Sequence, residues 1–229
     1  MRYECEQVEL KRKDDGTDLY LTKFWCPASW QDKNILMVHG LTYTQHVFDI
    51  KYKDYSVCEY FAKNGYTVWR LDLSGYGKSG KYEDGWKVTT QHAAEDEIYA
   101  LEKICELQGV EKLDLLGWSW GTMTTSKVAS QRPDLLKKVV WLGPCFGGAF
   151  EATPVTELHG MWVDHTYAQD GGHGRPNGGA KEIMEIGDGW PIDTKAVKLL
   201  HLHGAGHAMY LEKDYYQTTR EAILKFISE

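Results

Sequence analysis

Between residues 66 and 142 the sequence alternates short apolar runs with longer amphipathic ones, and this order constrains the fold more than any other feature. Short apolar runs indicate strands, and apolar residues spaced three or four apart indicate helices. The expected elements are strands at 66–71, 112–116 and 137–142, with helices at 91–108 and 123–131 between them. Such an alternation predicts right-handed crossovers and a mostly parallel sheet with helices on both faces.

The preceding segments extend this sheet. Alternating residues at 3–11 and 19–25 flank the turn Asp14-Asp15-Gly16, which predicts an N-terminal antiparallel hairpin. An apolar run at 34–38 indicates a buried strand, and residues 55–64 have helical spacing that ends at Gly65. We therefore expect all 229 residues to form a single α/β domain.

The segment from about 145 to 195 differs from the rest because glycines crowd it, most densely at 170–179. This composition predicts a lid or an inserted loop region within the domain. A strand at 197–202 and a helix at about 213–227 are expected to close the chain.

Charge and cysteine content narrow the possible partners. The chain has 26 Lys and Arg against 33 Asp and Glu, and no dense basic stretch, which disfavours nucleic acid and anionic membranes as partners. The first residues contain no apolar core of a signal peptide, and no run is long enough to span a bilayer. None of the five cysteines forms a C-x-x-C pair, so we expect reduced thiols in a cytoplasmic protein, without bound metal.

The most informative motif is Gly117-Trp118-Ser119-Trp120-Gly121, which follows a predicted strand and opens a predicted helix. A serine at such a sharp turn is exposed as a nucleophile, and the small flanking residues let the strand and helix pass closely. The Trp120 amide is expected to point toward a developing oxyanion, in the favourable field of the helix N-terminus.

Three other motifs follow predicted strands, where open α/β sheets bind their ligands. His39-Gly40-Leu41-Thr42 offers the amide of Leu41 as a second oxyanion donor, with the His39 side chain expected to hold the loop. The glycine-rich turn at 72–79 lacks the spacing of a phosphate-binding loop. Gly204-Ala-Gly206-His207 follows the last predicted strand and supplies His207 as a candidate general base.

Taken together, these four motifs and their order resemble the α/β-hydrolase superfamily, in particular its esterase-like and lipase-like serine hydrolases. The resemblance covers roughly residues 20–145 and 197–229 and is specific for the superfamily, although not for a substrate. It implies a small-molecule ester or acyl substrate and no cofactor. The implied site residues are Ser119 as nucleophile, His207 as base, and the amides of Leu41 and Trp120 as the oxyanion hole.

The sequence departs from this family where the acidic member of the triad is expected. Asp164 is the best candidate, because 161–164 can form a short strand and 180–186 its crossover helix. Too few residues separate Asp188 from the strand at 197–202 for a parallel crossover. Asp193 and Glu151 are weaker candidates, and the alternative is that a strand and its carboxylate are missing between the lid and the histidine.

These motifs leave more than one function open. The leading hypothesis is a carboxylic ester hydrolase that forms an acyl-enzyme on Ser119, and peptidase or thioesterase activity would use the same groups. Dehalogenase or epoxide-hydrolase chemistry would need Asp at position 119. A weakened hydrolase that serves as a small-molecule binding module is the main alternative. A metal hydrolase using His201, His203 and His207 is less favoured, because no carboxylate accompanies them. The sequence contains no indication of the oligomeric state.

Overall fold

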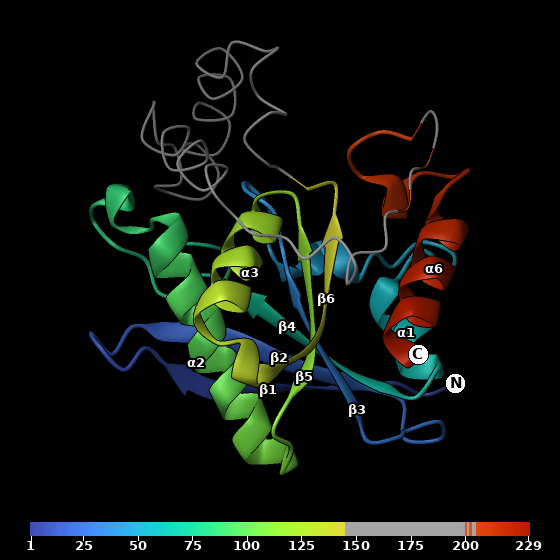
Figure 1. Ribbon diagram of the computed structural model, residues 1–229, viewed down its shortest axis with the longest axis horizontal. Helices are drawn as coiled ribbons and strands as arrows, with labels where there is room; N and C mark the ends of the chain where they lie inside the picture. The colour runs from blue at the N-terminus through green and yellow to red at the C-terminus, as the bar shows by residue number, and fades with distance from the viewer. Residues whose placement is uncertain (145–199, 201, 203–204) are drawn as a thin grey trace.

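The computed structural model describes residues 1–144, 200, 202 and 205–229, and six strands of these residues form one sheet (Figure 1). The lid expected at 145–195 lies outside the described residues, and so does Asp164. The strands follow the order β1-β2-β4-β3-β5-β6 across the sheet. They span β1 Glu4–Lys11, β2 Asp18–Trp25, β3 Lys33–Val38, β4 Tyr66–Asp72, β5 Leu113–Trp118 and β6 Leu136–Leu142.

The helices lie between and after these strands. The α-helices of the described residues are α1 Val57–Lys63, α2 Thr90–Gln108, α3 Trp120–Gln131 and α6 Tyr216–Ser228. Short 3₁₀ helices occur at η1 Gln45–Phe48, η2 Gly85–Lys87, η3 Pro133–Leu135 and η6 Met209–Leu211. None of the described helices is long and apolar enough to cross a bilayer.

The pairing of the strands confirms the predicted α/β architecture. Strand β1 pairs antiparallel with β2, and β2 pairs antiparallel with β4. Strands β4, β3, β5 and β6 pair with their neighbours in parallel, with α1, α2 and α3 as the crossovers. The carboxyl ends of four parallel strands therefore meet at one edge, where the sequence motifs follow them.

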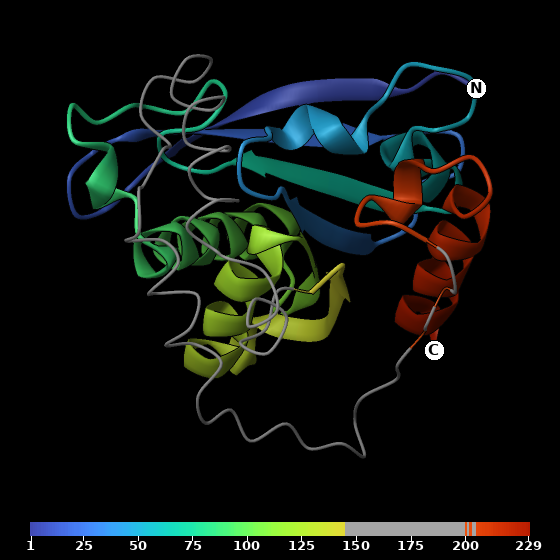
Figure 2. The same cartoon turned by 90° about the horizontal axis from the view of Figure 1, so that it is seen from above.

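Two apolar layers cover the two faces of the sheet. In β3, Leu36 and Val38 pack into the layer under α2 and α3, whereas Ile35 and Met37 pack into the layer under α1 and α6. The two views show these helix pairs on opposite sides of the strands (Figures 1 and 2). Successive side chains of a strand point to opposite faces of the sheet. Because both faces are covered here, every residue of such a strand can be apolar.

Several boundaries differ from the sequence predictions, and the most important concern the nucleophile turn. Strand β5 continues through Trp118, which pairs with Leu142 of β6, and α3 begins at Trp120 rather than Met123. The threonines of this helix, which lower its intrinsic propensity, donate their hydroxyl hydrogens back to its carbonyls, as Thr125 does to Gly121 O. Strand and helix therefore leave only Ser119 between them.

At the C-terminal end, the predictions were less accurate. Helix α6 begins at Tyr216, three residues after the expected start, because a turn precedes it in which Tyr215 N donates to Glu212 O at 3.0 Å. Leu200 and Leu202, the described residues of the strand expected at 197–202, are not in a strand.

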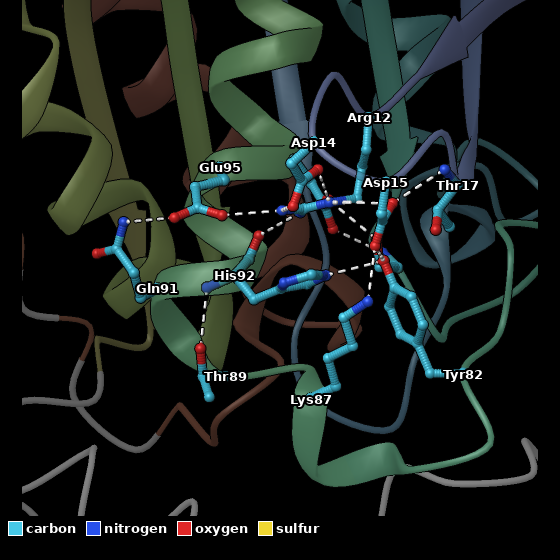
Figure 3. Close-up of polar contacts among 12 residues, drawn as sticks. Arg12, Asp14, Asp15, Thr17, Tyr82, Lys87, Thr89, Gln91, His92 and Glu95 are labelled. Carbon is cyan, nitrogen blue, oxygen red and sulfur yellow. Dashed lines mark hydrogen bonds and ion pairs between the residues drawn. The ribbon is translucent and has the colours of Figure 1, made fainter.

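A buried ionic network fixes the N-terminal hairpin to α2 (Figure 3). The Arg12 guanidinium donates to Asp96 at 2.5 Å, to Glu95 at 2.8 Å and to Asp14 at 2.9 Å. Asp96 also accepts the amide of Ser74, at 2.7 Å, from the loop after β4. These contacts hold the hairpin, α2 and the loop after β4 together.

The residue after Asp96 has a different environment. Glu97 is fully buried, and neither of its carboxyl oxygens has a hydrogen-bond partner among the residues that the structure describes. Thr124 lies close to it but donates its hydroxyl hydrogen to Gly121 O at 3.1 Å. Burial holds the pKa of Glu97 well above its usual value of 4.5, which favours the neutral form of the side chain.

Candidate active site

Ser119 occupies a strained turn between β5 and α3. Its φ of 57° and ψ of −124° lie outside the regions that non-glycine residues usually occupy, which costs on the order of 1–3 kcal/mol. The Ser119 amide donates to Leu142 O at 3.0 Å, and its carbonyl accepts from Thr122 N at 2.8 Å. Its side chain makes no capping hydrogen bond to α3. The backbone therefore positions the hydroxyl.

Three glycines make this turn sterically possible. A Cβ on Gly117 would lie 2.3 Å from Gly121 O, and one on Gly121 would lie 2.7 Å from Val38 O. A Cβ on Gly40 would lie 2.7 Å from the Cβ of Ser119. These distances are far below normal contact, so the strand, the helix and the loop after β3 approach closely only because side chains are absent. The flanking glycines of the motif have the steric role that the sequence predicts.

His207 lies directly beside this serine. Its Nε2 is 2.7 Å from Ser119 Oγ, although the two residues are 88 positions apart in the chain. His207 is in the loop before η6, at the same edge of the sheet as the ends of β5 and β6. The structure thus brings together the two residues that the sequence predicts as nucleophile and base.

The surroundings of the imidazole affect its charge. The His207 residue is exposed, but protein groups enclose part of its ring, and this desolvation lowers its pKa below 6.5. Gly143, with φ of 53°, approaches the ring so closely that a Cβ there would lie 2.9 Å from Nδ1. A neutral imidazole with Nε2 toward a hydroxyl is the form that can accept its proton.

No acidic partner of this histidine occurs in the described part of the chain. Among those residues, no carboxylate hydrogen-bonds to the His207 ring, and Ser119 Oγ is its partner. Asp164, Asp188, Asp193 and Glu151 all lie outside the described residues. Within the same limits, no three His, Cys, Asp or Glu side chains gather as metal ligands would, and His201 and His203 also lie outside them.

The two predicted oxyanion donors belong to segments that adjoin Ser119. Trp120 is the first residue of α3, and Leu41 follows the glycine that contacts Ser119. The next residue, Thr42, has φ of 73°, an unusual conformation for a β-branched side chain. Such strain is found where a backbone is held in a functional geometry, and here it adjoins the loop that carries the Leu41 amide.

The side chains of His39 and Asp72 form hydrogen bonds that hold this loop in place. The Leu73 amide donates to His39 Nε2 at 3.2 Å, so Nδ1 carries the hydrogen and faces Gly40 O at 2.8 Å. Asp72 accepts from Gln45 N at 2.7 Å and from Lys78 N at 2.9 Å. Both side chains are fully buried. They link the loops after β3 and β4, and the glycine-rich turn at 72–79 folds around its own aspartate.

The two tryptophans of the motif point to opposite faces of the sheet. Trp120 packs into the layer under α2 and α3 and donates its indole hydrogen to Thr90 Oγ1 at 3.2 Å. Trp118 packs into the other layer and donates to the carbonyl of His207 at 3.0 Å. No local sequence pattern links Trp118 or Gly143 to the histidine, because their contacts join segments that are distant in the chain.

Comparison with known proteins agrees with this architecture. A family model described as alpha/beta hydrolase fold matches residues 33–172, more than half of the chain. Similar solved structures include an epoxide hydrolase from Vigna radiata, with 20% identity and a TM-score of 0.51. Potato (Solanum tuberosum) epoxide hydrolase I is 23% identical, with a TM-score of 0.52.

These alignments cover 71% and 74% of this chain, but only 47% and 46% of the respective epoxide hydrolases. The chain thus spans less than half the length of each. Identities this low establish a shared fold alone. The family match and the strand order together show that the chain belongs to the alpha/beta hydrolase fold family.

Proposed function

We propose that this hydrolase-family protein cleaves carboxylic esters through an acyl-enzyme on Ser119. The observation that carries the proposal is the 2.7 Å contact between Ser119 Oγ and His207 Nε2. A hydroxyl in contact with a neutral imidazole is the activated nucleophile of acyl transfer. Peptide and thioester substrates would use the same groups.

In the proposed reaction, Ser119 Oγ attacks the ester carbonyl while His207 Nε2 takes its proton. The amides of Leu41 and Trp120 would donate hydrogen bonds to the oxyanion of the tetrahedral intermediate. The intermediate collapses as His207 returns the proton to the leaving alcohol. Water then attacks the acyl-enzyme with His207 as base, which releases the acid and restores the serine.

The nature of the nucleophile argues against epoxide hydrolysis in this chain, despite the fold that it shares with epoxide hydrolases. A serine oxygen that opened an epoxide would form an ether with the substrate carbon. Water cannot clear an ether as it clears an ester, so the protein would be alkylated after one turnover. A carboxylate at the turn would avoid this outcome, but position 119 is serine. We therefore expect acyl substrates.

The proposed roles of Ser119 and His207 do not require that the acidic member of the triad be identified. Asp164 stays the sequence's candidate, and the proposal for Ser119 and His207 does not depend on it. Loss of the acid in a Ser-His-Asp protease lowers kcat by about 10⁴, which still leaves hydrolysis above the uncatalysed rate. A slow esterase is therefore compatible with the proposal.

A fluorophosphonate probe tests the nucleophile directly, because it modifies an activated serine covalently. We expect labelling of the wild-type protein, hydrolysis of p-nitrophenyl acetate, and loss of both in Ser119→Ala. Ser126→Ala is the matched control, since Ser126 is buried like Ser119 but lies within α3 and takes no part in the proposed reaction. Styrene oxide should not be turned over.

Absence of labelling in a folded wild-type protein would contradict the enzyme hypothesis. The lack of a carboxylate at His207 among the described residues would then favour the second candidate, a small-molecule binding module on a hydrolase fold. Saturable quenching of tryptophan fluorescence by ester analogues, without turnover, would support that alternative.

A further inference from the structure

The side chain of Trp118 makes two separate contacts with His207. Its indole Nε1 donates to the backbone carbonyl of His207 at 3.0 Å. Its ring lies beside the imidazole, with centroids 5.7 Å apart and planes inclined by 37°. One contact fixes the backbone of the histidine loop, and the other limits the space in which the imidazole can rotate.

Trp118 is itself held firmly. It ends strand β5 and pairs with Leu142 of β6, and its side chain is only 3% exposed. Tyr43 and Tyr210 pack edge-on against its ring, at centroid distances of 4.9 Å and 5.4 Å. A side chain fixed by a strand and two aromatic contacts can transmit that order to a neighbour in a loop.

We propose that Trp118 is a positioning residue that holds His207 against Ser119, a role that rests on the proposed hydrolase function. In a complete triad, a carboxylate hydrogen-bonded to Nδ1 sets the orientation of the imidazole. Among the described residues no carboxylate does so, whereas Trp118 restrains both the backbone and the ring of His207.

Of the two tryptophans that flank Ser119, Trp118 contacts His207, whereas Trp120 has a different partner. Trp120 is buried to a similar extent, but its indole donates to Thr90 of α2 on the opposite face of the sheet. Trp118 therefore connects the nucleophile strand to the histidine loop, while Trp120 connects the following helix to α2.

The Trp118→Phe variant tests this role, because it removes the indole N–H and keeps an aromatic ring. We expect kcat for p-nitrophenyl acetate to fall by about 10-fold, the value of one ordinary hydrogen bond, with KM nearly unchanged. Trp69→Phe is the matched control, since Trp69 is fully buried in β4 and its indole donates to Asn34 at 3.0 Å. That variant should retain the wild-type kcat.

A second measurement separates positioning from mere packing and requires no turnover. The pKa of His207 can be followed by NMR, with its signal identified by loss in His207→Gln. We expect this pKa to rise toward 6.5 in Trp118→Phe, because a loosened loop exposes the ring to water. The Trp69→Phe control should leave it unchanged.

The outcomes distinguish the two proposals. A folded Trp118→Phe protein with the wild-type kcat and the wild-type His207 pKa would overturn the positioning role. If Trp118→Phe does not fold, benzothienylalanine at position 118 removes the N–H while preserving the ring volume, and the same readouts apply. If the wild type fails to label at Ser119 but the His207 pKa shift occurs, the hydrolase proposal fails while the structural coupling stands.

Discussion

The two residues that meet in this site are held by different kinds of structure. Ser119 lies in a turn whose geometry is set by backbone packed on backbone, with Gly117, Gly121 and Gly40 allowing the contacts. His207 lies in a loop held by a tryptophan side chain and by the approach of Gly143. The position of the nucleophile therefore follows from the backbone packing of the fold. The position of the base depends on side-chain contacts to a loop.

This difference determines how each half of the site should respond to substitution. A side chain added at the nucleophile turn meets backbone atoms of two other elements, which cannot move without separating strand from helix. A side chain added beside the base meets the imidazole and the backbone carbonyl of His207, which both belong to a loop that can shift. We expect damage to the turn to appear as loss of stability, and damage at the histidine to appear as loss of rate.

The largest effect is expected for Gly117→Ala. The added methyl group would lie 2.3 Å from Gly121 O and 2.6 Å from Thr125 Oγ1, so β5 and α3 must move apart. We expect the free energy of unfolding to fall by about 3 kcal/mol or more, in the range typical of severe core damage, with loss of esterase activity. Urea denaturation followed by circular dichroism measures this loss.

Gly109→Ala is the control, because Gly109 has φ of 65° but nothing within 4 Å of an added Cβ. It should lose only about 1–2 kcal/mol, the cost of the left-handed conformation for alanine. If Gly117→Ala is no less stable than Gly109→Ala, the turn is not limited by backbone contact and the comparison fails.

A smaller change in stability, but a marked change in rate, is expected for Gly143→Ala. The methyl group would lie 2.9 Å from His207 Nδ1, at a residue with φ of 53°. We expect a stability loss like that of Gly109→Ala, because the loop and ring can yield. The displaced imidazole should lower kcat by about 100-fold, as a misplacement of about 1 Å commonly does.

Steady-state kinetics of the two alanine variants, measured side by side, checks this expectation. Gly109→Ala should keep the wild-type kcat, because its strain is remote from the site. Equal kcat values for Gly109→Ala and Gly143→Ala would mean that His207 does not depend on this contact.

The difference between the turn at Ser119 and the loop at His207 also explains which features the sequence could predict. The order of strands and helices from 66 to 142 follows from local periodicity, and its pairing as a parallel sheet is confirmed. The position of Ser119 between β5 and α3 also follows from a local motif. Boundaries were less accurate where tertiary contacts override propensity, as at α3, which begins at Trp120 rather than at the expected Met123.

The support of His207 could not be predicted, because it comes from residue pairs that no local pattern connects. Trp118 and His207 are 89 positions apart, and nothing in the Gly-x-Ser-x-Gly motif specifies the direction of its first tryptophan. The buried network of Arg12, Ser74 and Asp96 is similar, since it joins three separate elements. Contacts of this kind emerge only once the sheet order is fixed.

The smallest expected effect concerns the pH dependence of kcat/KM, which tests whether a carboxylate contacts His207. Hydrolysis requires the neutral imidazole, so kcat/KM should fall on the acid side as His207 gains a proton. Burial without an opposing carboxylate lowers the pKa of His207, which predicts that this acid limb lies below 6.5. A carboxylate on Nδ1 would favour the charged ring and move the limb upward instead. A profile of kcat/KM against pH with p-nitrophenyl acetate locates the limb.

The variant Asp164→Asn turns this profile into a test of the missing acid. With the limb below 6.5, the substitution should leave its position unchanged, because no carboxylate then contributes to the pKa of His207. A wild-type limb at or above 6.5 that moves to lower pH in Asp164→Asn would assign the acid to Asp164. In that event the Asp164 carboxylate would orient His207 together with Trp118. The position of His207 would then be fixed more firmly than the described contacts alone indicate.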